Sequence, residues 1–135
     1  MSYPVTEITG IDDDVAKALK VAGIRTTAGL LEAAKDPKGR KALAARTGLR
    51  ESQLLDWANV ADRMRIKGVG ADYADLLNTA GVRTVRDLKH RNAARLFRSI
   101  RDANEKRKRV QFLPSEKAVT RWIEQAKKLP LVIKY

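Results

Sequence analysis

The 135-residue chain has no cysteine, which excludes disulfides, thiolate metal sites and thiol nucleophiles. Only 5% of its residues are aromatic, and no alternating run of β-branched residues is long enough to predict a sheet. No apolar stretch approaches the length that spans a bilayer, and residues 1 to 9 lack the pattern of a signal peptide. Alanine, leucine, lysine and arginine dominate instead. We therefore expect an all-α, soluble, cytoplasmic protein without a membrane partner.

The sequence also has few candidates for catalytic or metal-binding residues. His90 is the only histidine, and no second histidine or cysteine could share a metal with it. No acid, base and nucleophile are arranged in a pattern that predicts a reaction. The sequence therefore predicts no enzyme, no catalytic residue, no cofactor and no metal, and places His90 at a helix end or on the surface.

What the chain has in excess is positive charge. Its 28 lysines and arginines outnumber 16 aspartates and glutamates, for a formal net charge of +12. Residues 1 to 65 carry 11 basic and 9 acidic side chains, a net charge of +2, whereas residues 66 to 135 carry 17 and 7, a net charge of +10. A field this uneven favours a polyanionic partner at the second half, and nucleic acid is the usual one.

An internal repeat divides the chain at the same place. Ile8-Thr9-Gly10-Ile11-Asp12 and Ala22-Gly23-Ile24-Arg25-Thr26 match Ile66-Lys67-Gly68-Val69-Gly70 and Ala80-Gly81-Val82-Arg83-Thr84 at a constant offset of 58. Trp57 and Trp122 recur at an offset of 65, which predicts a short insertion in the second copy, within residues 104 to 109. We expect two units, 1–65 and 66–135, packed as pseudo-duplicate halves around one core.

Each copy has the pattern of a helix, a tight turn, a second helix, a cap and a third helix. Gly23 and Gly81 are typical of left-handed residues that end helices, and Thr26 and Thr84 are typical N-caps. Further helices are expected at about 36–48, 51–65, 93–104 and 116–129.

The glycine turn of the second copy suits a phosphate. Gly68 and Gly70 lack a Cβ, so they can adopt positive φ and let another backbone approach closely. The amides of the turn and of the next helix's first turn then point outward with partial positive charge, while Val69 turns inward. The first copy has Asp12 in place of Gly70, followed by Asp13 and Asp14, and carboxylates there occupy the site that an anion would use. We expect the first turn to be structural and self-capped. Asp72 weakens the second turn in the same way without removing its amides.

A row of arginines accompanies that turn. Four arginines are separated by four, three and three residues: Arg91, Arg95, Arg98 and Arg101. On a helix, this spacing would align them on one face, and the guanidinium group suits phosphate oxygens. The run 106–109 continues the positive charge into an expected loop. The predicted DNA-binding residues are Lys67, Gly68, Val69, Gly70, Arg83, Thr84, Arg91, Arg95, Arg98 and Arg101.

These motifs resemble two known patterns. The turn 67–70 with Ala80-Gly81-Val82-Arg83-Thr84 is similar to the helix-hairpin-helix motif of sequence-independent DNA-binding proteins. Over nearly the whole chain, including residues 122–127 and 129–135, the sequence resembles the bacterial family called domain of unknown function 4332. The motif resemblance implies that hairpin amides hold the backbone of one strand and that bases are not read.

We therefore expect a sequence-independent binder of nucleic acid, of double-stranded DNA in particular, associated with the nucleoid. The alternative is a protein-interaction scaffold, because tandem helical hairpins also serve in that role. Trp57 and Trp122 are expected as core anchors rather than stacking platforms. The apolar segment 131–135 either packs against the bundle or joins a neighbour's surface.

Overall fold

The computed structural model describes residues 2–135, and the elements within them are helices, apart from one isolated bridge between Pro4 and Thr26. Met1, the first residue of the expected unit 1–65, lies outside the described residues. Within them, a short 3-10 helix, η1, is followed by eight α-helices. Their bounds are η1 Val5–Glu7, α1 Asp13–Val21, α2 Thr27–Ala34, α3 Pro37–Thr47, α4 Glu51–Arg63, α5 Ala71–Thr79, α6 Val85–Leu88, α7 Ala93–Lys106 and α8 Glu116–Lys128. The expected all-α class is confirmed.

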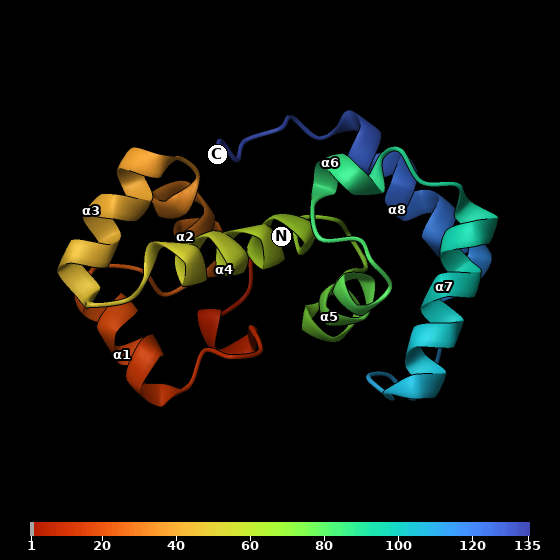
Figure 1. Cartoon of the computed structure of the whole chain (residues 1–135), viewed down its shortest axis with the longest axis horizontal. Coiled ribbons are helices and arrows are strands. Elements are labelled where there is room, and N and C mark those ends of the chain that lie inside the picture. The colour runs from red at the N-terminus through yellow and green to blue at the C-terminus, as the bar shows by residue number, and fades with distance from the viewer. Residues whose placement is uncertain (1) are drawn as a thin grey trace.

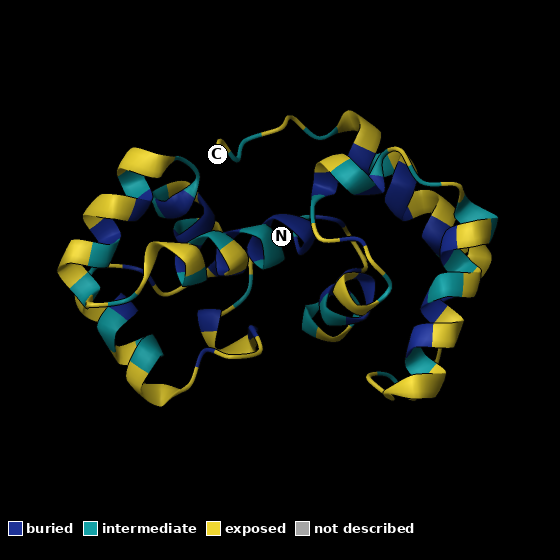
Figure 2. Ribbon diagram, viewed as in Figure 1, coloured by how far each residue is buried: buried dark blue, intermediate teal, exposed yellow. Residues whose placement is uncertain are grey.

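Helix α4 runs through the middle of the molecule and joins two groups of helices (Figure 1). Helices α1 to α3 gather at one end, and α5 to α8 gather at the other. Helix α4 packs on α2 and α3 and also reaches α5 and α6. The boundary expected at residue 65 falls in the turn that follows α4. One continuous cluster of buried side chains extends through both groups, so the two ends share a single core (Figure 2).

Three helix pairings occur at both ends, whereas the packing of α2 on α3 is not repeated between α6 and α7. Helix α1 packs on α3 as α5 packs on α7, and α3 packs on α4 as α7 packs on α8. Helix α2 contacts α4, and the short α6 contacts α8. None of the helices in residues 2–135 is both long and apolar enough to cross a membrane.

Side-chain caps explain where most helices begin. The Thr26 hydroxyl accepts a hydrogen bond from the Gly29 amide, and the Asp36 carboxylate accepts one from the Gly39 amide, each at the third helical position. The same arrangement recurs at Thr84, Asn92 and Ser115. Helix ends follow the glycine pattern, because φ is +86° at Gly23, +77° at Gly48 and +96° at Gly81. The caps predicted at Thr26, Asp36 and Thr84 are confirmed.

The C-terminal segment packs internally. After α8 the chain crosses back toward the first group of helices (Figure 1). There the Lys134 amide donates to the Lys35 carbonyl at 2.7 Å, and the Lys134 carbonyl accepts from the Arg40 guanidinium at 2.8 Å. Arg40 is only 5% exposed and also donates to the Ala34 carbonyl at 2.9 Å. Of the two positions left open for this segment, the structure has the internal one.

Candidate nucleic-acid interface

The second hairpin, residues 66–70, leads from the end of α4 into α5. Gly68 is exposed and has a φ of +93°, a conformation that strains any residue with a Cβ. Val69 is fully buried, as expected for the residue that pins the turn to the core. Gly70 was expected to use positive φ as well, but its φ is −88°. Its missing side chain matters for another reason, because Gly70 is the N-cap of α5.

The hairpin is held against α8 by two side chains. A Cβ on Gly68 would lie 3.3 Å from the indole Nε1 of Trp122, so the turn passes close over that buried ring. Gln125 clasps Lys67, since its Oε1 accepts from the Lys67 amide at 2.9 Å and its Nε2 donates to the Lys67 carbonyl at 3.2 Å. These contacts occupy the backbone of Lys67 and leave its exposed side chain at the surface.

The first hairpin, residues 8–12, has the same backbone with different chemistry. Gly10 has a φ of +95°, and its missing Cβ would lie 3.5 Å from the indole Nε1 of Trp57. Asp12 is the N-cap of α1, and its carboxylate accepts a hydrogen bond from the Val15 amide at 2.9 Å. In the second hairpin, no side chain among residues 2–135 caps α5 in this way. The self-capping expected of the first hairpin is confirmed.

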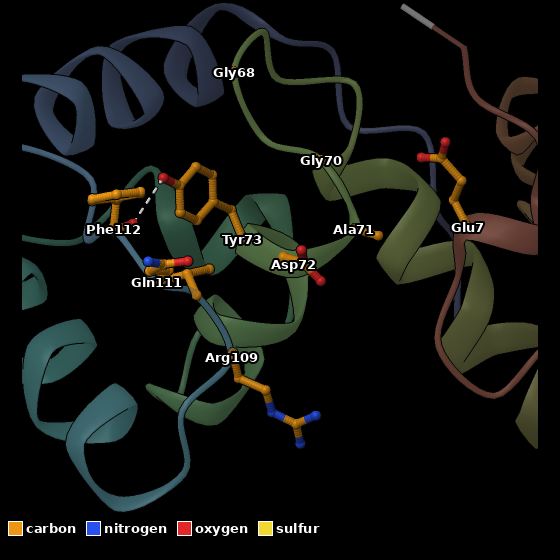
Figure 3. A pocket seen from close by; sticks show the side chains of 10 residues that line it. Glu7, Gly68, Gly70, Ala71, Asp72, Tyr73, Arg109, Gln111 and Phe112 are labelled. Carbon is orange, nitrogen blue, oxygen red and sulfur yellow. Dashed lines mark hydrogen bonds between the residues drawn. The ribbon is translucent and has the colours of Figure 1, made fainter.

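Two pockets flank the second hairpin. One, of about 500 Å³, lies between the hairpin and the loop that follows α7 (Figure 3). The other, of about 390 Å³, lies on the side of α8. Gly68 and Tyr73 border both pockets. The first adds Arg109 and Phe112 from the loop, whereas the second adds Lys67, Arg121 and Gln125.

The larger pocket also contains acidic groups. Asp72 lies in the first turn of α5, and Glu7 reaches the pocket from the first half of the chain (Figure 3). Both carboxylates repel a phosphate placed inside the pocket, whereas Lys67, Arg109 and Arg121 attract one at its margins and on the α8 side. Asp72 was predicted to weaken phosphate binding at this turn. The structure adds Glu7, a second carboxylate with the same effect, which the sequence pattern did not reveal.

Part of the predicted residue set lies elsewhere. Arg83 and Thr84 border a different pocket, of about 390 Å³, beside Arg63 and Tyr135. The Thr84 hydroxyl caps α6 by accepting from the Asp87 amide at 2.9 Å. The structure therefore does not bring Arg83 and Thr84 to the pockets of the second hairpin.

The arginine row is shorter than its spacing predicted. Arg91 precedes Asn92, the N-cap of α7, so it is not on that helix. Its guanidinium instead pairs with Asp87 at 3.0 Å and donates to the Gly81 carbonyl at 2.9 Å. The remaining arginines, Arg95, Arg98 and Arg101, are exposed on α7, the helix farthest from the first group (Figure 1). Arg101 lies 3.5 Å from the Asp102 carboxylate.

Sequence reasoning missed Arg121 and Phe112, and it left Arg109 outside the predicted set. Arg121 could have been found, because it adjoins Trp122, whose repeat partner Trp57 marks the face that covers the hairpin. Arg109 lies within residues 104–109, where an insertion was expected, but α7 continues to Lys106 and the loop that follows it covers residues 107–115. Phe112 carried no periodic signal, since it belongs to a loop.

Arg63 and Asp62 are charged yet buried between the two groups of helices. Burial lowers the pKa of Arg63 to about 10, against the opposing effects of Asp75 and Asp62. Burial also raises the pKa of Asp62, although Arg65 opposes this by donating to its carboxylate at 2.7 Å. Arg63 donates to the Arg83 carbonyl, and its Nε has no hydrogen-bond partner among the described groups. Arg63 borders the pocket of Arg83 and Thr84, and neither Arg63 nor Asp62 lines the two pockets that flank the second hairpin.

The described residues contain no group of three or more histidine, cysteine, aspartate or glutamate side chains that could hold a metal. Among known families, the model described as a domain of unknown function (DUF4332) matches residues 9–129. Comparison with curated proteins and with solved structures gave no match.

Proposed function

Because the chain belongs to the family described as domain of unknown function 4332, whose description names no activity, we propose a function from the geometry of the second hairpin. The protein binds the sugar-phosphate backbone of nucleic acid, double-stranded DNA in particular, and does not read sequence. It acts as a binding module rather than an enzyme, in the cytoplasm and on the nucleoid. Each half is a helix-hairpin-helix unit, and the two units are pseudo-duplicates of which only the second holds phosphate.

The difference between the two N-caps supports this proposal most directly. Asp12 fills the end of α1 with a carboxylate that accepts from the Val15 amide. Gly70 leaves the equivalent end of α5 open, and a helix N-terminus with unpaired amides attracts an anion. The open end also belongs to the half with a net charge of +10.

Basic side chains around the hairpin supply the long-range attraction. Lys67 and Arg121 border the pocket on the α8 side, and Arg109 borders the other. Arg95 and Arg98 extend the positive surface along α7. Contacts of this kind neutralise phosphates and release counterions, which makes binding strong in dilute salt and indifferent to sequence.

Fluorescence anisotropy with two unrelated DNA duplexes tests the proposal at about 50 to 200 mM salt. We expect equal affinities for both duplexes and, for about four phosphate contacts, a slope of log K against log salt near −3.6. Lys67→Glu, and Arg95→Glu combined with Arg98→Glu, weaken both duplexes alike. Lys17→Glu, on α1 in the first half, is the matched control and leaves binding unchanged.

A protein-interaction scaffold is the second candidate. Leu131 is 49% exposed and Tyr135 is 67% exposed in the segment that bridges the halves, so a partner could extend over both. Absence of binding to either duplex at the lowest salt would overturn the DNA proposal in favour of this one.

A further inference from the structure

Phe112 is an exposed aromatic side chain that borders the larger pocket beside the second hairpin. It is 76% exposed, although burying a phenylalanine contributes about 1.5–3 kcal/mol to stability. It lies in the loop 107–115, which occupies the insertion that the first half lacks. The exposed side chain therefore belongs to a segment present only in the half with the open hairpin.

The loop is held in place on both sides of Phe112. The Asn104 carboxamide accepts from the amides of Arg109 and Val110, at 2.8 and 3.1 Å, and donates to the Val110 carbonyl at 3.1 Å. Pro114 is buried on the other side. The Tyr73 hydroxyl donates to the Phe112 carbonyl at 3.1 Å, as Figure 3 shows. These bonds fix the backbone at Phe112 while its ring stays in solvent.

The surroundings of the ring combine three chemistries. Arg107, Lys108 and Arg109 precede it and attract phosphate. The pocket of about 500 Å³ that Phe112 borders has the carboxylates of Asp72 and Glu7 on its wall together with Arg109, so hydrogen-bond acceptors lie beside a group that attracts phosphate. Carboxylates accept hydrogen bonds from the exocyclic amino groups of bases, and a phenylalanine ring stacks on a base face.

We infer that this loop and pocket take an unpaired base of a strand whose phosphates lie on the adjoining basic residues. The ligand class is therefore DNA in which a duplex adjoins a single-stranded segment. Phe112 stacks on the unpaired base, and Asp72 favours bases that carry an amino group, cytosine over thymine. This inference rests on the proposed function, because the second hairpin must hold the neighbouring backbone.

A protein ligand fits these observations less well. An acidic peptide would satisfy Arg107 to Arg109, but it would meet repulsion from Asp72 and Glu7 in the pocket. A nucleotide carries a negative phosphate next to an uncharged base with amino donors, and the pocket has Arg109 next to two carboxylates that accept from such donors. This match of charge distribution decides in favour of the nucleic acid.

The test compares a blunt duplex with the same duplex carrying a short single-stranded extension of cytosines or of thymines. We expect the cytosine extension to raise affinity roughly tenfold over the blunt duplex, within the range measured for stacking on aromatic residues. Phe112→Ala brings the ratio of extended to blunt affinity close to one, and Phe112→Tyr retains it. Asp72→Asn removes the preference for cytosine over thymine.

Val21→Ala is the matched control, because Val21 is 82% exposed on α1 in the first half and its loss leaves the ratio unchanged. Phe112→Trp supplies a direct signal, since its exposed indole is quenched when a base stacks on it, whereas Trp57 and Trp122 are buried. Equal affinity for blunt and extended duplexes, or an unchanged ratio in Phe112→Ala, would overturn this inference and leave the proposed function standing. Failure to bind every probe at low salt would overturn both.

Discussion

The two hairpins share a backbone and differ in what their N-caps offer. Gly10 and Gly68 have nearly the same φ, +95° and +93°, and each lies over the indole of a buried tryptophan. The N-cap carboxylate of Asp12 closes one helix end, while Gly70 leaves the other without a side-chain cap. The exchange of Asp12 for Gly70, next to that of Asp13 for Ala71, therefore separates a hairpin whose helix end is capped by a side chain from one whose helix end is not.

The two halves also differ outside the hairpins, in how their third helices use arginine. Counted from their N-caps, Arg40 on α3 and Leu96 on α7 occupy the same helical position, and both are buried. The first half uses its arginine internally, to hold backbone carbonyls. The second half has leucine there and exposes Arg95 and Arg98 instead. At this helical position, positive charge supports the structure of the first half, and an apolar side chain takes its place in the second.

The largest effect is expected at Arg40. Arg40→Ala leaves the carbonyls of Ala34 and Lys134 without their charged donor, and hydrogen bonds to charged groups contribute about 1.5–3 kcal/mol. We expect a loss of about 3 kcal/mol in the free energy of unfolding, measured by urea denaturation. The neighbouring exposed residue provides the control, because Lys41→Ala should cost less than about 0.5 kcal/mol. Equal costs at the two positions would show that Arg40 does not anchor the segment.

The hairpin glycines come next. Gly68→Ala and Gly10→Ala force a Cβ into the left-handed region, at a cost of roughly 1–2 kcal/mol each. Gly23→Ala separates the cost of the backbone conformation from the cost of a steric clash. Gly23 has a φ of +86°, but its Cβ would meet nothing within 4 Å. Gly68→Ala should therefore cost more than Gly23→Ala, because its Cβ also presses on the Trp122 indole. Thermal unfolding of the three variants gives the comparison, and a less stable Gly23→Ala would contradict it.

The smallest change in stability, and the sharpest functional one, comes from exchanging the caps. Gly70→Asp should alter the free energy of unfolding by only a few tenths of a kcal/mol, and Asp12→Gly by a similar amount. In DNA binding the two should diverge. Gly70→Asp introduces a carboxylate at the open end of α5 and reduces the steepness of the salt slope by about 0.9, the value of one phosphate contact. Asp12→Gly should not weaken binding, and a weaker complex in that variant would place phosphate at the first hairpin.

Local signals predicted much of this fold. Asp36 before Pro37, and glycines at 23, 48 and 81, mark helix ends through backbone preferences that act within a few residues, and the structure has them there. The change in repeat offset between the glycine turns and the tryptophans predicted an insertion within residues 104–109, whereas the loop in the structure covers residues 107–115. The all-α class followed from the lack of any strand pattern.

Contacts between distant residues could not be predicted in this way. Spacing placed Arg91 on the helix with Arg95, but the N-cap Asn92 begins α7 one residue later, and Asp87 and Gly81 bind Arg91. Burial of Arg40 and the clasp of Gln125 on Lys67 depend on which chain segment lies opposite each side chain. The pocket at the second hairpin joins Glu7 to Phe112, and only the tertiary arrangement brings them together.

The segment that returns from α8 to α3 also governs how the molecule comes apart. The bond from Arg40 to Lys134 joins residues 94 positions apart, so it forms only after nearly the whole chain has been brought together. Closing so large a loop is slow compared with forming helices, but its entropic cost grows only slowly with length. Once closed, the loop couples the C-terminal segment to Lys35 and Arg40, so this segment joins the two groups of helices in addition to α4. Unfolding should therefore follow a single cooperative transition, in which the halves behave as one thermodynamic unit.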